Sequence, residues 1–137
     1  MITAIDTNVL LDILIPNDLF FASSQAGLEE ASLQGSLVIC DFVFAELCIH
    51  FTSHSECDRF LDDNQIRVEP LVREAHFLAG RIWQAYRQKG GKQNRILCDF
   101  FIAAHAHVQA NRLLTRDRGF YRKQFPKLNV VEPGQGR

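Results

Sequence analysis

Five short apolar segments alternate with longer segments of helical character along this chain, and the alternation limits the folds available to it. Each apolar segment is rich in Ile, Leu and Val, which is typical of a strand buried on both faces. The five segments are residues 2–6, 36–40, 66–70, 112–115 and 128–131. Strands that are separated by helices predict an α/β fold with a mainly parallel sheet.

Helices are predicted in the intervening segments, over residues 8–15, 18–34, 42–52, 56–63, 72–89, 96–110 and, as a short helix or turn, 118–124. Pro16 and Gly35 stop the first two of them. Asp41 and Ser55 precede the next two and are expected to cap them. Phe77 is expected on the buried face of the helix over 72–89.

A length of 137 residues fits one domain with a real core, so we expect a single domain over 1–132 and a frayed tail over 133–137. No apolar run approaches the roughly 18–20 residues of a membrane span. The N-terminus lacks the basic region of a signal peptide. The four cysteines show no CxxC spacing and are interpreted as reduced core residues of a cytoplasmic protein.

Four carboxylates stand in apolar surroundings. Asp6 and Asp117 each follow a predicted strand, whereas Glu46 and Asp99 lie inside apolar helical segments. A buried ionised carboxylate is costly unless something compensates it. Because the carboxyl ends of parallel strands meet at one edge of a sheet, Asp6 and Asp117 are expected to lie on the same edge.

A divalent cation is the simplest compensator that all four carboxylates could share. Oxygen ligands without Cys or His favour Mg²⁺ or Mn²⁺, whose natural chemistry is phosphoryl transfer or phosphodiester hydrolysis. Each acid also has a structural explanation when it is taken alone: a helix cap for Asp6, a solvent-facing edge for Glu46, a helix dipole for Asp99 and a polar loop for Asp117. Asp12 is interpreted as a structural acid with which a basic residue can pair.

Charge is unevenly distributed along the chain. Residues 1–68 hold 11 Asp or Glu and 2 Lys or Arg, whereas residues 69–137 hold 5 and 13. A basic C-terminal half is consistent with a polyanionic partner, and equally with two solvated surfaces of opposite sign.

Four motifs of the chain, in this order, resemble those of the PIN domain: residues 5–12 (IDTNVLLD), 44–47 (FAEL), 98–104 (CDFFIAA) and 114–117 (LTRD). Among small free-standing PIN domains the chain is most similar to VapC-type toxins of prokaryotic toxin–antitoxin pairs. The resemblance implies a three-layer α/β/α sandwich and an endoribonuclease that depends on Mg²⁺ or Mn²⁺. It also implies an RNA substrate, a cognate VapB-like antitoxin and a homodimer.

The resemblance assigns roles to particular residues. Asp6 and Asp99 would bind the metal, Glu46 would join them or position the attacking water, and Asp117 would complete the acidic pocket. Supporting hydrogen bonds are expected from Thr7, Asn8 and Thr115, and contacts to RNA phosphates from Arg95, Arg116 and Arg118. Two alternatives stay open: a housekeeping RNA-processing nuclease of the PIN type without an antitoxin, and a non-catalytic domain on the same scaffold that binds RNA or protein.

Overall fold

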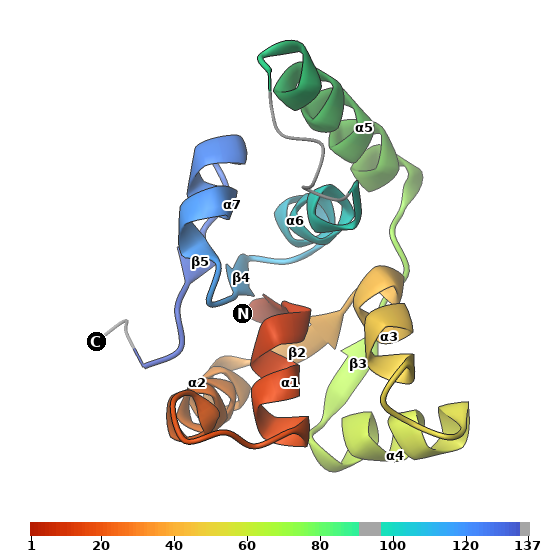
Figure 1. Cartoon of the computed structure of the whole chain (residues 1–137), viewed down its shortest axis with the longest axis vertical. Coiled ribbons are helices and arrows are strands. Elements are labelled where there is room, and N and C mark those ends of the chain that lie inside the picture. The colour runs from red at the N-terminus through yellow and green to blue at the C-terminus, as the bar shows by residue number, and fades with distance from the viewer. Residues whose placement is uncertain (91–96, 135–137) are drawn as a thin grey trace.

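The computed structural model describes residues 1–90 and 97–134. Its five strands form one parallel sheet in the order β3-β2-β1-β4-β5 (Figure 1). The strands are β1 (Ile2–Ile5), β2 (Ser36–Ile39), β3 (Ile66–Val68), β4 (Arg112–Leu114) and β5 (Val130–Val131). All five predicted strands are therefore present, each of them shorter than expected.

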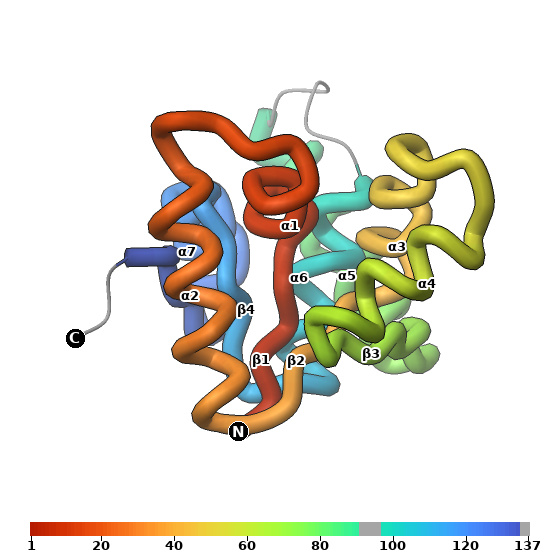
Figure 2. The backbone as a smooth tube through the Cα atoms, turned by 90° about the horizontal axis from the view of Figure 1, so that it is seen from below, coloured from red at the N-terminus to blue at the C-terminus, as the bar shows by residue number. Residues whose placement is uncertain are grey.

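The described residues also form seven helices. They are α1 (Thr7–Leu14), α2 (Phe21–Gln34), α3 (Asp41–Cys48), α4 (His54–Asp63), α5 (Arg73–Gln88), α6 (Leu97–Gln109) and α7 (Arg118–Gln124). The helices α5 and α6 pack against each other on one side of the sheet, and α1 and α2 pack on the other (Figures 1 and 2). The expected α/β/α sandwich is confirmed.

The register of the central strands determines which side chains meet at the carboxyl edge of the sheet. In β1, Ile5 pairs with Leu114 of β4, so the residues after these two strands become neighbours. The amide of Asp6 donates a hydrogen bond to the Leu114 carbonyl at 3.0 Å, which extends the pairing by one residue. Figure 2 shows β1 rising from the N-terminus to α1 beside β4. Asp6 and the loop that begins at Thr115 therefore lie side by side.

Gly35 lies where α2 turns into β2. A Cβ atom at this position would lie 1.9 Å from the carbonyl oxygen of Met1, so the close approach of the two chain segments requires glycine. The amide of the next residue, Ser36, donates to the same Met1 oxygen at 2.9 Å. The predicted end of the second helix is confirmed, and its cause is this contact with the start of β1.

Two predicted helix caps are wrong. Asp41 is not the cap of α3, because Cys40 occupies that position and Asp41 lies in the first turn, where its Oδ1 accepts from the Leu71 amide at 3.3 Å. Ser55 does not cap α4 either. Ser53 does so, with its hydroxyl accepting from the Glu56 amide at 3.3 Å. The predicted helix over 42–52 is also too long, since α3 ends at Cys48.

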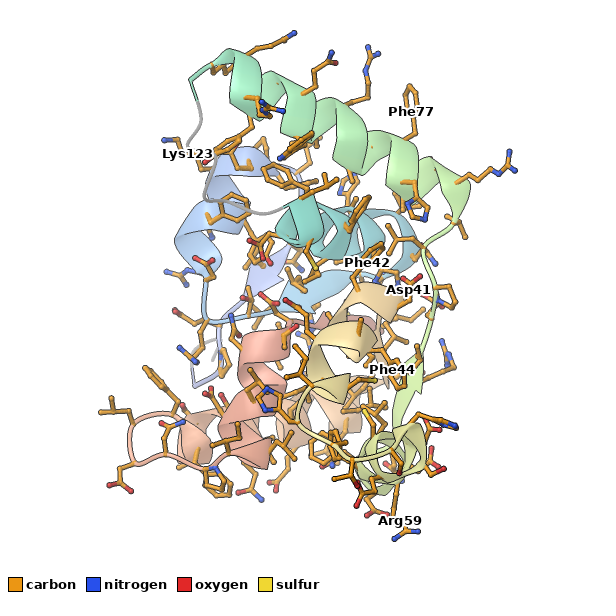
Figure 3. All side chains as sticks on the ribbon, turned by 45° about the vertical axis from the view of Figure 1, so that its right-hand side comes forward. Asp41, Phe42, Phe44, Arg59, Phe77 and Lys123 are labelled. Carbon is orange, nitrogen blue, oxygen red and sulfur yellow. The ribbon has the colours of Figure 1, made fainter. Side chains whose placement is uncertain are left out.

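The expected burial of Phe77 is wrong as well. Its side chain is 68% exposed and points away from α5 (Figure 3), and Cζ of Arg81 lies 5.5 Å from its ring centroid. The buried residues Ala75 and Ala79 define the inner face of α5. Residue 77 is about 200° away from residue 75 around a helix, so it cannot share that face.

Several simpler expectations can be read from the described residues. No helix within 1–90 or 97–134 combines the length and the apolarity that crossing a membrane requires. All four cysteines are free, with Cys40 and Cys57 buried. Pro133, at the start of the expected tail, is buried, while residues 135–137 and Ile96 lie outside the described residues. The boundary at residue 132 stays a prediction.

Candidate functional site

Asp6 lies at the centre of the carboxyl edge of the sheet and is 5% exposed. It caps α1, because its Oδ1 accepts from the Thr7 amide at 2.7 Å. Burial raises its pKa from 3.8 to about 6, and the negative charge of Asp99 adds to this rise. Hydrogen bonds from Thr115, Tyr121 and Thr7 act in the opposite direction without cancelling it. Asp6 is therefore both a helix cap and a carboxylate that is costly to ionise.

Side chains from α1 and from the loop after β4 hold the second oxygen of Asp6. The Thr115 hydroxyl donates to Asp6 Oδ2 at 2.8 Å, and the Asn8 amide group lies 3.4 Å from the same oxygen. Asn8 Nδ2 also lies 3.3 Å from Thr115 Oγ1. The amide of Asp117 donates to that hydroxyl oxygen at 2.9 Å. Thr115 thus joins Asp6 to the backbone of Asp117.

Glu46 reaches the same edge from α3 and is partly exposed. Its Oε1 accepts from the Thr7 hydroxyl at 2.5 Å, so Thr7 contacts Asp6 through its amide and Glu46 through its side chain. Nearby, burial, together with the charges of Glu46 and Asp99, raises the pKa of the Cys98 thiol to about 12. Cys98 is therefore a neutral thiol at physiological pH in the metal-free protein.

Tyr121 was not anticipated from the sequence, yet it connects three of the four acids. It is fully buried, and burial together with the charges of Asp6, Asp99 and Asp117 raises the pKa of its phenol well above the usual value. It also shares a hydrogen bond with Asp6. The one signal that could have revealed it is its position on α7, four residues after Asp117, which is the spacing of neighbours on one helix face.

The expected phosphate-contacting arginines have different environments. The guanidinium of Arg116 binds the buried carboxylate of Asp12, with Nε 2.7 Å from Oδ2 and Nη2 3.0 Å from Oδ1, while its side chain is 30% exposed. The pairing of Asp12 with a basic residue is confirmed, and the contact of Arg116 with RNA phosphate stays a prediction. Arg118 Nη1 lies 3.8 Å from Glu132 Oε2. Arg95 lies outside the described residues.

The four acids therefore come from four separate elements and lie close enough to perturb shared neighbours. Within residues 1–90 and 97–134, however, no group of three or more His, Cys, Asp or Glu side chains is arranged tightly enough to hold a metal ion. Both oxygens of Asp6 and Oε1 of Glu46 accept hydrogen bonds from protein donors. The chemistry of the donor set fits a hard cation, because it offers carboxylate and hydroxyl oxygens and a burial cost on Asp6 that a cation would relieve.

The PIN domain family model matches residues 3–126, a range that contains all four acids. VapBC2 from Rickettsia felis, solved bound to a DNA fragment from its promoter, is similar in structure: TM-score 0.71 and 24% identity over 97% of this chain and 99% of that one. VapBC-1 from nontypeable Haemophilus influenzae has a TM-score of 0.71 and 18% identity, over 96% of this chain and 98% of that one. A toxin–antitoxin complex from Klebsiella pneumoniae has a TM-score of 0.66 and 17% identity, over 98% of this chain and 99% of that one. At sequence identities this low, the similarity to these structures shows that the fold is shared and nothing more. No curated protein matches the chain.

Proposed function

This chain belongs to the PIN-domain family, and on that premise we propose that it is an endoribonuclease dependent on Mg²⁺ or Mn²⁺, and the toxin of a VapBC-type pair. The observation that carries the proposal is Asp6, a buried carboxylate whose pKa is raised to about 6 next to Asp99. Burial makes the ionised form of Asp6 costly, and a bound cation would offset that cost. The family match and the arrangement of the acids support the same site.

In this proposal Asp6 and Asp99 hold the cation, with Glu46 and Asp117 completing the acidic pocket. When bound, the cation would supply activation of water and neutralisation of the charge that develops on the leaving oxygen. Thr7 fixes the orientation of both Asp6 and Glu46 through its two hydrogen bonds.

Thr115 and Asn8 have an orienting role in the proposal. Thr115 fixes Asp6 against the backbone of Asp117, and Asn8 bonds to both Asp6 and Thr115. Such contacts hold carboxylates in place as ligands and tune their affinity for a metal. Cys98, as a neutral thiol in the metal-free protein, has no role in the proposal.

The partners follow from the family and stay part of the proposal. We propose RNA as the substrate, a VapB-like antitoxin as the inhibitor, a homodimer as the assembly and the cytoplasm as the location. The similarity to solved VapBC and toxin–antitoxin complexes supports the antitoxin. Expression of the chain should arrest growth, and co-expression of a small protein encoded immediately upstream should relieve the arrest. A housekeeping nuclease would have no such neighbour.

The nuclease activity is tested with Asp99→Asn, which keeps the size of the side chain and removes its charge. The rate of RNA cleavage with Mg²⁺ should fall by about 100-fold or more. A catalytic cation stabilises the transition state by several kcal/mol, and each loss of about 1.4 kcal/mol lowers the rate tenfold. Asp63→Asn, a change to an exposed acid at the end of α4, is the matched control. Undiminished cleavage by Asp99→Asn would refute the proposal.

Calorimetric titration with Mn²⁺ separates the nuclease from a non-catalytic domain on the same scaffold. The nuclease should give a binding heat in the wild type that Asp99→Asn removes and Asp63→Asn retains. A binding module should give no heat that depends on Asp99.

A further inference from the structure

An ion pair whose carboxylate is buried lies one turn of α1 away from the acidic site. The side chain of Asp12 is only 4% exposed, and the guanidinium of Arg116 binds both of its oxygens, at 2.7 and 3.0 Å. Ser24 Oγ donates to Asp12 Oδ2 at 2.6 Å, and Asn17 Nδ2 lies 3.4 Å from Oδ1. The ring of Phe20 covers the guanidinium, with 3.9 Å between Cζ and the ring centroid. Both charges are thus fixed in place by their surroundings.

The backbone of Arg116 points toward the site while its side chain points toward Asp12. Its amide donates to Asn8 Oδ1 at 3.2 Å. The residues on either side of it are Thr115, which donates to Asp6 at 2.8 Å, and Asp117. Asn8 and Asp12 are four residues apart on α1 and so lie on one face of that helix. One helix face therefore attaches the loop over 115–117 at two points, through a backbone amide and through a guanidinium.

We propose that Asp12 and Arg116 are positioning residues for the acidic site. Their ion pair fixes the loop over 115–117 against α1, and this sets the places of the Thr115 hydroxyl and the Asp117 carboxylate relative to Asp6. The inference rests on the proposed function, since it assumes that the site binds a cation. Contact with RNA, the role expected of Arg116 from the sequence, is the alternative from which the test separates it.

The chemistry of the pair explains why the fixation depends on both partners. The planar fork of Arg binds a carboxylate at two points, which a Lys ammonium cannot reproduce. Removal of Arg116 leaves the carboxylate of Asp12, which is 4% exposed, without its cationic partner, so it must neutralise or move toward water; removal of Asp12 leaves the side chain of Arg116, which is 30% exposed, able to turn toward water. Either response releases the loop, and carboxylates that bind metals lose affinity when the groups that orient them are removed.

The test compares Asp12→Asn, Arg116→Gln and the double variant with wild type. Arg67→Gln is the matched control, since it breaks an exposed ion pair with Glu69 that lies on β3 and the segment after it. Calorimetry with Mn²⁺ should show affinity weakened about tenfold or more in both single variants. The double variant should match the single ones, because each removes the same interaction. Arg67→Gln should bind Mn²⁺ as wild type does.

Two further measurements distinguish positioning from RNA contact and from a purely structural role. In metal-free protein, hydrogen exchange at the amides of Arg116 and Asp117 should speed up in both single variants, whereas the amides of β1 keep their protection. In RNA cleavage, both variants should lower kcat to a similar extent and leave KM unchanged. Arg116→Lys should fold and keep only part of the Mn²⁺ affinity, which keeps the test informative if Arg116→Gln is unstable.

Three results would overturn the inference. A raised KM in Arg116→Gln with a normal KM in Asp12→Asn would make Arg116 an RNA contact. Wild-type Mn²⁺ affinity and amide exchange in folded variants with lowered Tm would make the pair purely structural. Single variants whose losses in Mn²⁺ affinity add in the double variant would show that the two residues act separately. Absence of Mn²⁺ heat in wild type would refute the proposed function instead, and the exchange rates would still report on the loop in metal-free protein.

Discussion

The raised pKa of Asp6 makes the stability of the metal-free protein depend on pH in an unusual direction. An ordinary acid of the unfolded chain ionises near pH 3.8, whereas Asp6 in the folded protein ionises near pH 6. Between these values the folded state holds a proton that the unfolded state has released. Stability therefore falls as pH rises from about 3.8 to about 6, and it changes no further from this cause above that range.

The magnitude follows from the pKa change. Because one pKa unit corresponds to about 1.4 kcal/mol, ionising Asp6 costs the folded state about 3 kcal/mol at pH 7. Asp6 is 5% exposed, so solvent does little to reduce this figure. Bound Mn²⁺ favours the ionised form, and saturating Mn²⁺ should therefore remove the cost.

The assay is urea unfolding of wild type and Asp6→Asn at pH 4, 5, 6 and 7, each with EDTA and with Mn²⁺. With EDTA the stability of Asp6→Asn relative to wild type should increase by about 2 kcal/mol from pH 4 to pH 7, because part of the change lies below pH 4; the contributions of groups that do not interact with Asp6 cancel in the comparison. A difference that stays constant across this range, or one that decreases, would refute the reasoning. So would a pH dependence that Mn²⁺ leaves unchanged.

Further predictions concern the glycines, the caps and the buried phenol. Gly35→Ala should lower the free energy of unfolding by about 2 kcal/mol or more, because the added Cβ would clash with the carbonyl oxygen of Met1. Gly80→Ala on α5, where a Cβ meets open space, should raise it by about 1 kcal/mol. Urea unfolding measures both. Ser53→Ala should lower the free energy of unfolding by about 1 kcal/mol in the same assay, and Ser55→Ala should lower it much less. Equal losses would contradict the assignment of Ser53 as the cap of α4. Tyr121→Phe should raise the pKa of Asp6 above about 6, as followed by carboxyl NMR, because a hydrogen bond to the ionised form is lost; a lower pKa would contradict the assigned contact.

The sequence predicts the layers of this fold and the meeting of Asp6 with the Asp117 loop because both follow from local patterns. Short apolar strands between helices require a parallel sheet, and parallel strands end at a common edge. The pairing of Ile5 with Leu114 is the physical basis of that prediction. No contact between distant side chains had to be known for it.

What the sequence could not predict depends on contacts between distant segments. The ion pair of Asp12 and Arg116 joins positions 104 residues apart, and neither flanking sequence specifies the other. Phe77 is exposed because α5 buries the face that carries the small residues Ala75 and Ala79. The pattern of large apolar residues in the sequence does not indicate that face. Tyr121 has the appearance of a core aromatic residue until the charges of Asp6, Asp99 and Asp117 near it are known.

The central claim, that the carboxylates of four separate elements share one cation, is tested most directly by anomalous diffraction from crystals grown with Mn²⁺. The account predicts a Mn²⁺ peak about 2.0–2.3 Å from carboxylate oxygens of Asp6 and Asp99, with Glu46 and Asp117 bordering it. Well-ordered carboxylates with no peak between them, or a peak elsewhere on the protein alone, would contradict it.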